Sequence, residues 1–215
     1  MNVYRTQAAD CRTRRDKGMC EFVSIGEDQV IERNMALAER KDYTVEDLEK
    51  LPEDVRAELI DGQMFLFASP RTTHQRLILA LGTTLKQHID EKGGSCETLL
   101  APLDVRLNQD NRTQVQPDVM VVCDPDKVHE EGIWGAPDLI IEIVSKSTKR
   151  RDYGLKLLKY RTAGVREYWV VDPFKRTVMV CWFEDETEND CYGFDEPISF
   201  HIFPELAVRI QDLLP

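Results

Sequence analysis

The chain has 215 residues, of which 42% are hydrophobic, so it can form one large domain with a sizeable core. No apolar stretch approaches the roughly 20 residues of a membrane-spanning helix, and the first residues lack the apolar core of a secretory signal. We therefore predict a cytoplasmic protein with no membrane partner. The 39 acidic and 28 basic side chains give a net charge of −11, which argues against non-specific nucleic-acid binding through bulk charge. A local basic patch or a bound metal remains compatible with a phosphate ligand.

The six cysteines are widely spaced, and none forms a C-x-x-C pair, so a structural zinc site is not expected. Cys123 and Cys181 lie in apolar runs and are interpreted as small core residues. A disulfide framework is not expected in a chain of this size without an export signal.

Residues 1–34 differ from the rest because they show no sustained hydrophobic periodicity and contain the basic run 12–17. We interpret them as a loosely ordered N-terminal extension, with a phosphate-contacting arm as the alternative. A single domain is predicted over 35–215, and Met35, which begins it, is an alternative start of translation.

In chain order, the first predicted element is a short helix after Thr44, which is followed by acidic residues in the first turn. The segment 57–67 reads as two strands joined at an Asp61-Gly62 turn. Apolar residues at i+4 spacing predict a long amphipathic helix over 73–91, which Gly93 and Gly94 end.

Further along, a helix capped by Ser147 and Thr148 is predicted to run to about Ala163 and to end at Gly164. The acidic stretch 184–190 is predicted to be a loop, and a last helical turn covers 208–214. The remaining apolar runs predict strands near 96–99, 103–107, 118–123, 138–144, 167–172, 177–183 and 198–202.

The strand–helix–strand segment 138–172 is typical of a βαβ unit with a right-handed crossover. The strands before it are joined by short loops and are expected to be antiparallel. The sequence therefore predicts an α/β protein with a mixed central sheet whose faces are covered by helices, and it contains no internal repeat.

Glu142 interrupts the apolar run 139–144, which reads as a strand buried on both faces. A carboxylate at such a position has to be paired, hydrogen-bonded or bound to metal, because an uncompensated buried charge is costly. Asp118 opens another apolar strand, 118–123. If the two strands are neighbours, the two carboxylates can face one site and share a hard cation such as Mg²⁺.

Lys156 lies 14 residues after Glu142 on the predicted helix and would add a positive charge to such a site. It shares a helix face with Asp152 and Tyr160. Alternatives stay open at this point: Asp118 as a turn residue, Lys156 as a solvated helix residue, or a buried ion pair of purely structural role. Asp152 is expected to pair with Lys156 or to cap the helix.

The order of several motifs resembles the Uma-type family of proposed endonucleases, over about residues 43–183. The residues that carry this resemblance are Glu58-Leu59-Ile60-Asp61-Gly62, Ser69-Pro70, His74, Gln116-Pro117-Asp118, Ile141-Glu142-Ile143-Val144-Ser145-Lys146-Ser147-Thr148, Asp152, Lys156, Tyr160, and Gly164-Val165-Arg166-Glu167-Tyr168-Trp169-Val170-Val171-Asp172-Pro173. That family belongs to the PD-(D/E)XK superfamily, so the resemblance implies a restriction-endonuclease-like fold with a mixed central sheet flanked by helices.

The resemblance also implies a Mg²⁺-dependent nuclease, with Mn²⁺ as a substitute, acting on DNA. It assigns Asp118 and Glu142 as metal ligands and catalytic residues, and Lys156 as the catalytic lysine. The superfamily lysine usually stands two places after the acidic residue, but Val144 occupies that position here.

The same resemblance makes Glu58 and His74 supporting residues: Glu58 toward the metal, and His74 toward the substrate, unless His74 only caps or packs its helix. Lys146 stands where family members usually have proline. Lys146 then either adds a cation to the site or projects into solvent, which we favour.

Two other functions share these residues. A non-catalytic binding or assembly protein that keeps the nuclease fold would explain the net charge of −11 and the absence of a lysine at 144. It predicts that Lys156 points away from the carboxylates. A phosphodiesterase acting on RNA or a nucleotide would share the site and differ in substrate. Cleavage of both strands of a duplex would be easiest for a homodimer.

Overall fold

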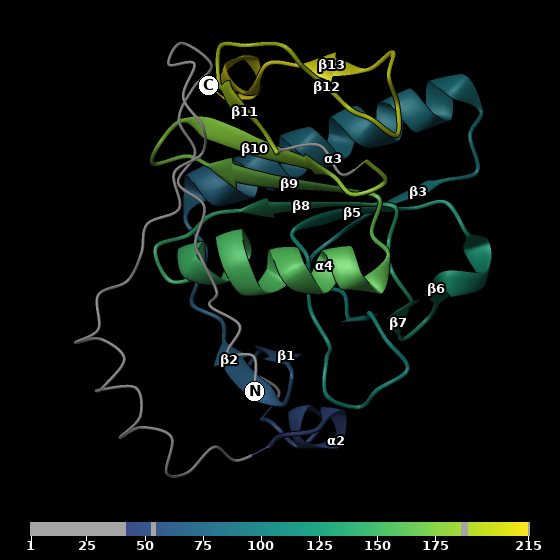
Figure 1. Cartoon of the computed structure of the whole chain (residues 1–215), viewed down its shortest axis with the longest axis vertical. Helices are drawn as coiled ribbons and strands as arrows, with labels where there is room; N and C mark the ends of the chain where they lie inside the picture. Colours follow the sequence, from purple (N-terminus) through teal and green to yellow (C-terminus); the bar gives the residue numbers. More distant parts are fainter. Residues whose placement is uncertain (1–41, 53–54, 186–188, 215) are drawn as a thin grey trace.

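The computed structural model describes residues 42–52, 55–185 and 189–214, so the predictions for residues 1–34 lie outside the described residues. At its centre is a six-stranded sheet in which β8 and β9 are parallel and the other neighbours are antiparallel (Figure 1). In spatial order the strands are β11 (Asp190–Gly193), β10 (Thr177–Trp182), β9 (Glu167–Asp172), β8 (Leu139–Ile143), β5 (Val119–Val122) and β3 (Glu97–Leu100). The predicted mixed α/β sheet is confirmed.

Helices cover the two faces of this sheet, as Figure 1 shows. Side chains alternate between the faces of a strand, and those of β5 and β8 divide accordingly into two buried clusters. The long helix α3 (Thr72–Lys92) packs on the face that carries Val119 and Ile141. The opposite face, with Met120 and Ile140, is covered by the π-helical turn η3 (Arg151–Lys156) and by α4 (Leu157–Ala163), which continues it.

Local chemistry explains where these elements end. Gly93 and Gly164 adopt left-handed conformations, with φ of 64° and 93°, and terminate α3 and α4 as predicted. The Asp61-Gly62 turn, with φ of 50° and 73°, joins β1 (Ala57–Ile60) to β2 (Gln63–Leu66). The short helix α2 (Val45–Leu48) begins with a capping box between Thr44 and Asp47.

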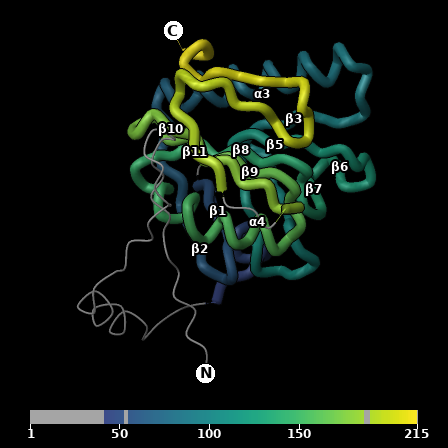
Figure 2. The backbone as a smooth tube through the Cα atoms, turned by 45° about the horizontal axis from the view of Figure 1, so that its top comes forward, coloured from purple at the N-terminus to yellow at the C-terminus, as the bar shows by residue number. Residues whose placement is uncertain are grey.

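Smaller units flank the central sheet. A three-stranded sheet contains β4 (Val105–Arg106), β7 (Gly132–Trp134) and β6 (Val128–His129), the last preceded by the 3-10 turn η2 (Pro125–Lys127). The pair β12 (Ile198–Ser199) and β13 (Ala207–Val208) and the 3-10 turn η4 (Ile210–Leu213) lie over the α3 side (Figures 1 and 2). No helix of the described residues is long and apolar enough to cross a membrane.

Three expectations differ from the structure. The strand predicted over 103–107 is reduced to β4, because its partners are the short strand β7 and a single bridge to Val115. The strands β6, β7, β11 and β13 were not predicted. Cys123 is not simply a core thiol: it forms a disulfide with Cys96, because the β3–β5 register, continued by one residue, places the two opposite each other.

Candidate active site

Glu142 lies in the middle of a buried network between the sheet and the helix that covers it. Its carboxylate oxygen Oε1 accepts hydrogen bonds from the Lys156 ammonium at 2.8 Å and from the Tyr160 hydroxyl at 2.6 Å. Only 4% of Glu142 and 1% of Lys156 is exposed. The parallel β8–β9 pair requires a helical crossover, and this crossover folds η3 and α4 back over β8 and brings Lys156 onto Glu142.

Glu58 reaches the same lysine from the β1–β2 hairpin. Its Oε1 lies 2.6 Å from Lys156 Nζ and accepts the backbone N–H of Gln116 at 3.0 Å. Its Oε2 lies 3.6 Å from Arg151 Nε, at the opposite end of η3 from Lys156. The structure therefore places Glu58 beside Lys156, where two cationic side chains balance its charge.

Asp118 lies just before β5 at the level of Glu142. The antiparallel register that pairs Val119 with Ile141 places Asp118 opposite Glu142 when it is continued by one residue. Asp118 Oδ2 accepts the backbone N–H of Ile143 at 2.7 Å and lies 3.2 Å from His74 Nε2. Asp118 and Glu142 therefore come from neighbouring strands, and His74 joins them from the first turn of α3.

Burial and charge shift the protonation of these groups. Burial raises the pKa of Glu142 well above its usual range; the Lys156 charge offsets this only in part, and the Asp118, Asp152 and Glu58 carboxylates raise the pKa further. Burial alone would lower the pKa of Lys156, but Glu142 and Glu58 raise it, so this lysine is charged. For His74, burial opposes protonation, and the Asp118 carboxylate more than compensates and raises its pKa.

Asp152 is a third buried carboxylate on this side of the sheet, and 1% of it is exposed. Burial raises its pKa to about 7, against the opposing effect of the Lys156 charge. Among the described residues, no donor lies within hydrogen-bond distance of either of its oxygens, and no cation lies within ion-pair distance. The predicted Asp152–Lys156 ion pair is therefore wrong, because the wide turn η3 separates the two side chains and Lys156 is engaged by Glu58 and Glu142.

A cavity of about 610 Å³ opens beside Glu142, Asp118, His74 and Lys156. Its described walls carry five cationic side chains and only two carboxylates, although the whole chain has a net charge of −11. The cations are Arg56, Arg71, Lys146, Arg151 and Lys156. Lys146 is exposed and also lines the cavity, so both interpretations of this residue describe part of its position. Cationic side chains therefore outnumber carboxylates on the described walls of this cavity, although the protein is acidic as a whole.

The two carboxylates that line the cavity have oxygens to offer a hard cation. The hydrogen bonds of Glu142 use Oε1 and those of Asp118 use Oδ2, so Oε2 of Glu142 and Oδ1 of Asp118 accept none from the described residues. No group of three or more His, Cys, Asp or Glu side chains in the described chain is arranged to hold a metal. Two carboxylates completed by water and phosphate oxygens fit Mg²⁺, which keeps several waters.

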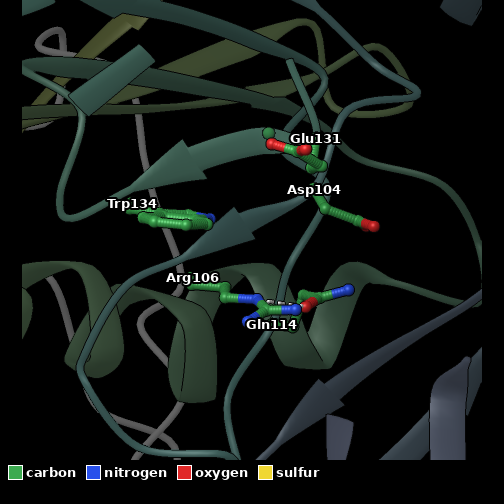
Figure 3. A pocket seen from close by; sticks show the side chains of 6 residues that line it. Asp104, Arg106, Gln114, Glu131 and Trp134 are labelled. Carbon is green, nitrogen blue, oxygen red and sulfur yellow. Dashed lines mark hydrogen bonds between the residues drawn. The ribbon is translucent and has the colours of Figure 1, made fainter. Parts of the chain in front are cut away.

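A second cavity, of about 300 Å³, lies on the small sheet and differs in chemistry. It is lined by Asp104, Arg106, Gln114, Glu131, Gly132 and Trp134 (Figure 3). The Arg106 guanidinium donates to Gln114 Oε1 at 3.2 Å through its Nε–H group, so this edge of the guanidinium is already hydrogen-bonded. With two carboxylates, one cation and no lysine, this cavity is a poor place for a phosphate, and the Glu142 cavity remains the candidate site.

Comparisons with known proteins identify the fold and the family of this chain. The chain is 33% identical over 104 residues to the uncharacterized protein slr1290 of Synechocystis sp.. The match covers 48% of this chain and 53% of that protein, so this chain spans about half the length of that curated relative. A crystal structure from Anabaena variabilis, described as a "putative nuclease", matches with a TM-score of 0.64 and 22% identity, over 79% of this chain and 96% of that one.

At that identity the structural match shows the fold alone, and this fold is the mixed central sheet flanked by helices that was predicted. The family model that matches covers residues 45–211, which includes every residue of the site described above. The chain therefore belongs to the Uma2 family, whose description is "Putative restriction endonuclease".

Proposed function

We propose that this protein is a metal-dependent nuclease that hydrolyses phosphodiester bonds of DNA. The observation that carries this proposal is the meeting of Asp118, Glu142 and Lys156 at one wall of a cavity whose remaining charges are cationic. A polyanionic strand can enter such a cavity in an acidic protein because the local charge, and not the net charge, acts on it at short range.

Asp118 Oδ1 and Glu142 Oε2 are the oxygens that would hold a Mg²⁺ or Mn²⁺ ion. When bound, such an ion supplies an activated water and stabilises negative charge on the phosphate. The protein prepares both ligands: the Ile143 N–H fixes Asp118, and Lys156 and Tyr160 fix Glu142. Each carboxylate thereby keeps one oxygen directed to its own donors and leaves the other for a cation.

Lys156 is proposed to balance the charge of this carboxylate cluster and to orient the phosphate next to it. Its ammonium touches both Glu142 and Glu58, so it is held in place before substrate arrives. Arg151, whose guanidinium lies 4.7 Å over the Phe65 ring, and the exposed Arg71 are proposed to hold the neighbouring phosphates.

The non-catalytic alternative predicts that Lys156 points away from the carboxylates, so the 2.8 Å contact with Glu142 supports the nuclease instead. A phosphodiesterase acting on RNA or a nucleotide would use the same groups. DNA cleavage and RNA cleavage are therefore compared in the same assay. A preference for RNA would mean that the substrate is RNA, with the same catalytic residues.

The test is cleavage of supercoiled plasmid, branched DNA and RNA by the purified full chain with Mg²⁺ or Mn²⁺, and with a chelator. Glu142→Gln and Asp118→Asn are expected to abolish cleavage. Asp138→Asn is the matched control. Asp138 lies directly before β8, the strand that carries Glu142, but at the end of that strand away from Glu142, where it accepts the Cys123 N–H at 2.8 Å. Absence of cleavage by the wild type with either metal, or equal cleavage by Glu142→Gln, would refute the proposal.

A further inference from the structure

Phe174 presents an exposed aromatic ring at the cavity that contains Glu142 and Lys156. It is 49% exposed, one of the few large apolar side chains of the described residues that are not covered. The turn after β9 fixes its backbone: Asp172 Oδ1 accepts the N–H groups of Phe174 and Lys175 at 2.9 and 3.1 Å. Asp172 is itself buried and lies 3.3 Å from the Lys149 ammonium. The ring is therefore carried on a rigid turn.

The register of the parallel strands places this turn close to the proposed reaction centre. Glu142 pairs with Val170 and Ile143 with Val171, and the N–H of Val144 donates to the Val171 carbonyl. Phe174 follows Val170 by four residues, a span of at most about 14 Å. A nucleotide next to one whose phosphate lies at Glu142 can therefore reach the Phe174 ring.

A second apolar surface lies on the β2 side of the same cavity. Leu66, which is 65% exposed, and Phe67 line it, and the Arg56 guanidinium lies 5.2 Å over the Phe67 ring. Arg56 is held in turn by Gln116, whose Oε1 accepts from it at 2.8 Å. The cavity thus combines cations that suit phosphates with apolar faces that suit a base.

We propose that this cavity binds an unpaired nucleotide of a DNA strand, with its base stacked on Phe174. Inside a continuous duplex the faces of each base are covered by its neighbours, so an aromatic side chain can reach a base face only where the strand is single or the base is displaced. The volume of about 610 Å³ is that of a small-ligand site. The substrate is then a single strand, a frayed end or a branch, and this inference rests on the proposed nuclease function.

The experiment uses a short single-stranded oligonucleotide that carries the fluorescent base 2-aminopurine, and the full-length Glu142→Gln chain, so that no cleavage occurs during binding. Stacking on an aromatic ring is expected to quench the fluorescence. Adding Phe174→Ala is expected to abolish the quenching and to weaken binding about 10-fold, whereas Phe174→Trp keeps both. A fully paired duplex of the same sequence is expected to compete poorly.

Trp134→Ala is the matched control, because Trp134 has the same 49% exposure and lines the other cavity. Unchanged quenching and affinity in Phe174→Ala, or equal binding of duplex and single strand, would overturn the inference. Quenching that depends on Phe174 while the wild type cleaves nothing would refute the nuclease and leave the binding site. Cleavage by the wild type with no effect of Phe174→Ala on KM would support the nuclease and refute the stacking of a base on Phe174.

Discussion

The Lys156 ammonium lies 2.8 Å from Glu142 Oε1, although the two residues are 14 positions apart and belong to different elements. The position two residues after Glu142, Val144, is 1% exposed in the apolar cluster on the same face. The positive charge beside Glu142 therefore comes from Lys156 on the crossover helix and not from a lysine on the strand itself. This contact organises the site, and the following predictions depend on it.

Replacing Lys156 with methionine is expected to lower the free energy of unfolding by about 3–5 kcal/mol, because Glu58 and Glu142 would remain buried without their common cation. Chemical denaturation of the variant measures the loss. Lys159→Met on the next turn is the control and is expected to change stability by less than about 1 kcal/mol, since its partner Asp61 is exposed. Adding Glu58→Gln and Glu142→Gln to Lys156→Met should restore part of the stability; no recovery would contradict the pairing.

Replacing Asp152 with asparagine is expected to stabilise the protein at pH 8. The folded-state pKa of about 7 lies above the ordinary value of about 3.8. The stability that the protonated Asp152 side chain contributes is therefore fully present below pH 4 and is lost as pH rises toward 7. At pH 8 the buried, deprotonated carboxylate lowers the free energy of unfolding by up to about 4 kcal/mol. Urea denaturation between pH 4 and pH 8 should show that the free energy of unfolding depends less on pH in Asp152→Asn than in the wild type. Parallel profiles for the variant and the wild type would show that Asp152 is not the titrating group.

The affinity for Mn²⁺ is expected to rise with pH through the pKa of His74. Asp118 raises this pKa above the ordinary 6.5, so the His74–Asp118 contact stabilises the fold below pH 6.5 and is lost as pH rises through the folded-state value. A protonated His74 also repels a cation at Asp118. Calorimetric titration at pH 6 and pH 8 should give a smaller pH effect for His74→Gln, and Asp118→Ala should lose binding. An equal pH effect in His74→Gln would exclude this role.

Binding of a single DNA strand is expected to weaken with salt, despite the net charge of −11, because the cavity cations contact phosphates. Replacing the exposed Arg71 or Lys146 with glutamine should each reduce the slope of log K against log salt by about 0.7. Lys86→Gln is the control, since Lys86 pairs with Asp90 on the exposed side of α3. A slope unchanged by Arg71→Gln and Lys146→Gln would place the strand elsewhere.

The sequence predicts the elements that have strong local signals. The amphipathic helix α3, its glycine stop, the Asp61-Gly62 turn and the β8–crossover–β9 unit follow from periodicity and turn chemistry, and the structure confirms them. The meeting of Glu142 with Lys156 was expected from the family resemblance, which assigns both residues to one site, whereas the residues alone left Lys156 open as a solvated helix residue.

Other parts of the site carry no local signal. The Glu58–Lys156 contact joins a hairpin to a helix 98 positions further along the chain, and only the folded arrangement brings them together. The π-helical turn η3 has no sequence signature, and the expected α-helical spacing therefore assigned Asp152 to Lys156 wrongly. Arg56 and Phe174 were missed as site residues because exposed residues without periodicity look like solvated ones until a cavity is seen, and Arg151 was missed because its place beside Glu58 depends on the fold.

The binding of a metal ion by Asp118 and Glu142 can be seen directly in the anomalous scattering of a crystal of the wild-type protein soaked in Mn²⁺. We expect a peak at about 2 Å from Asp118 Oδ1 and Glu142 Oε2, with Lys156 still in contact with Glu142. The same soak of Glu142→Gln should lose this peak. A peak between Asp104 and Glu131 in the second cavity, or an empty site between Asp118 and Glu142 at saturating Mn²⁺, would contradict it.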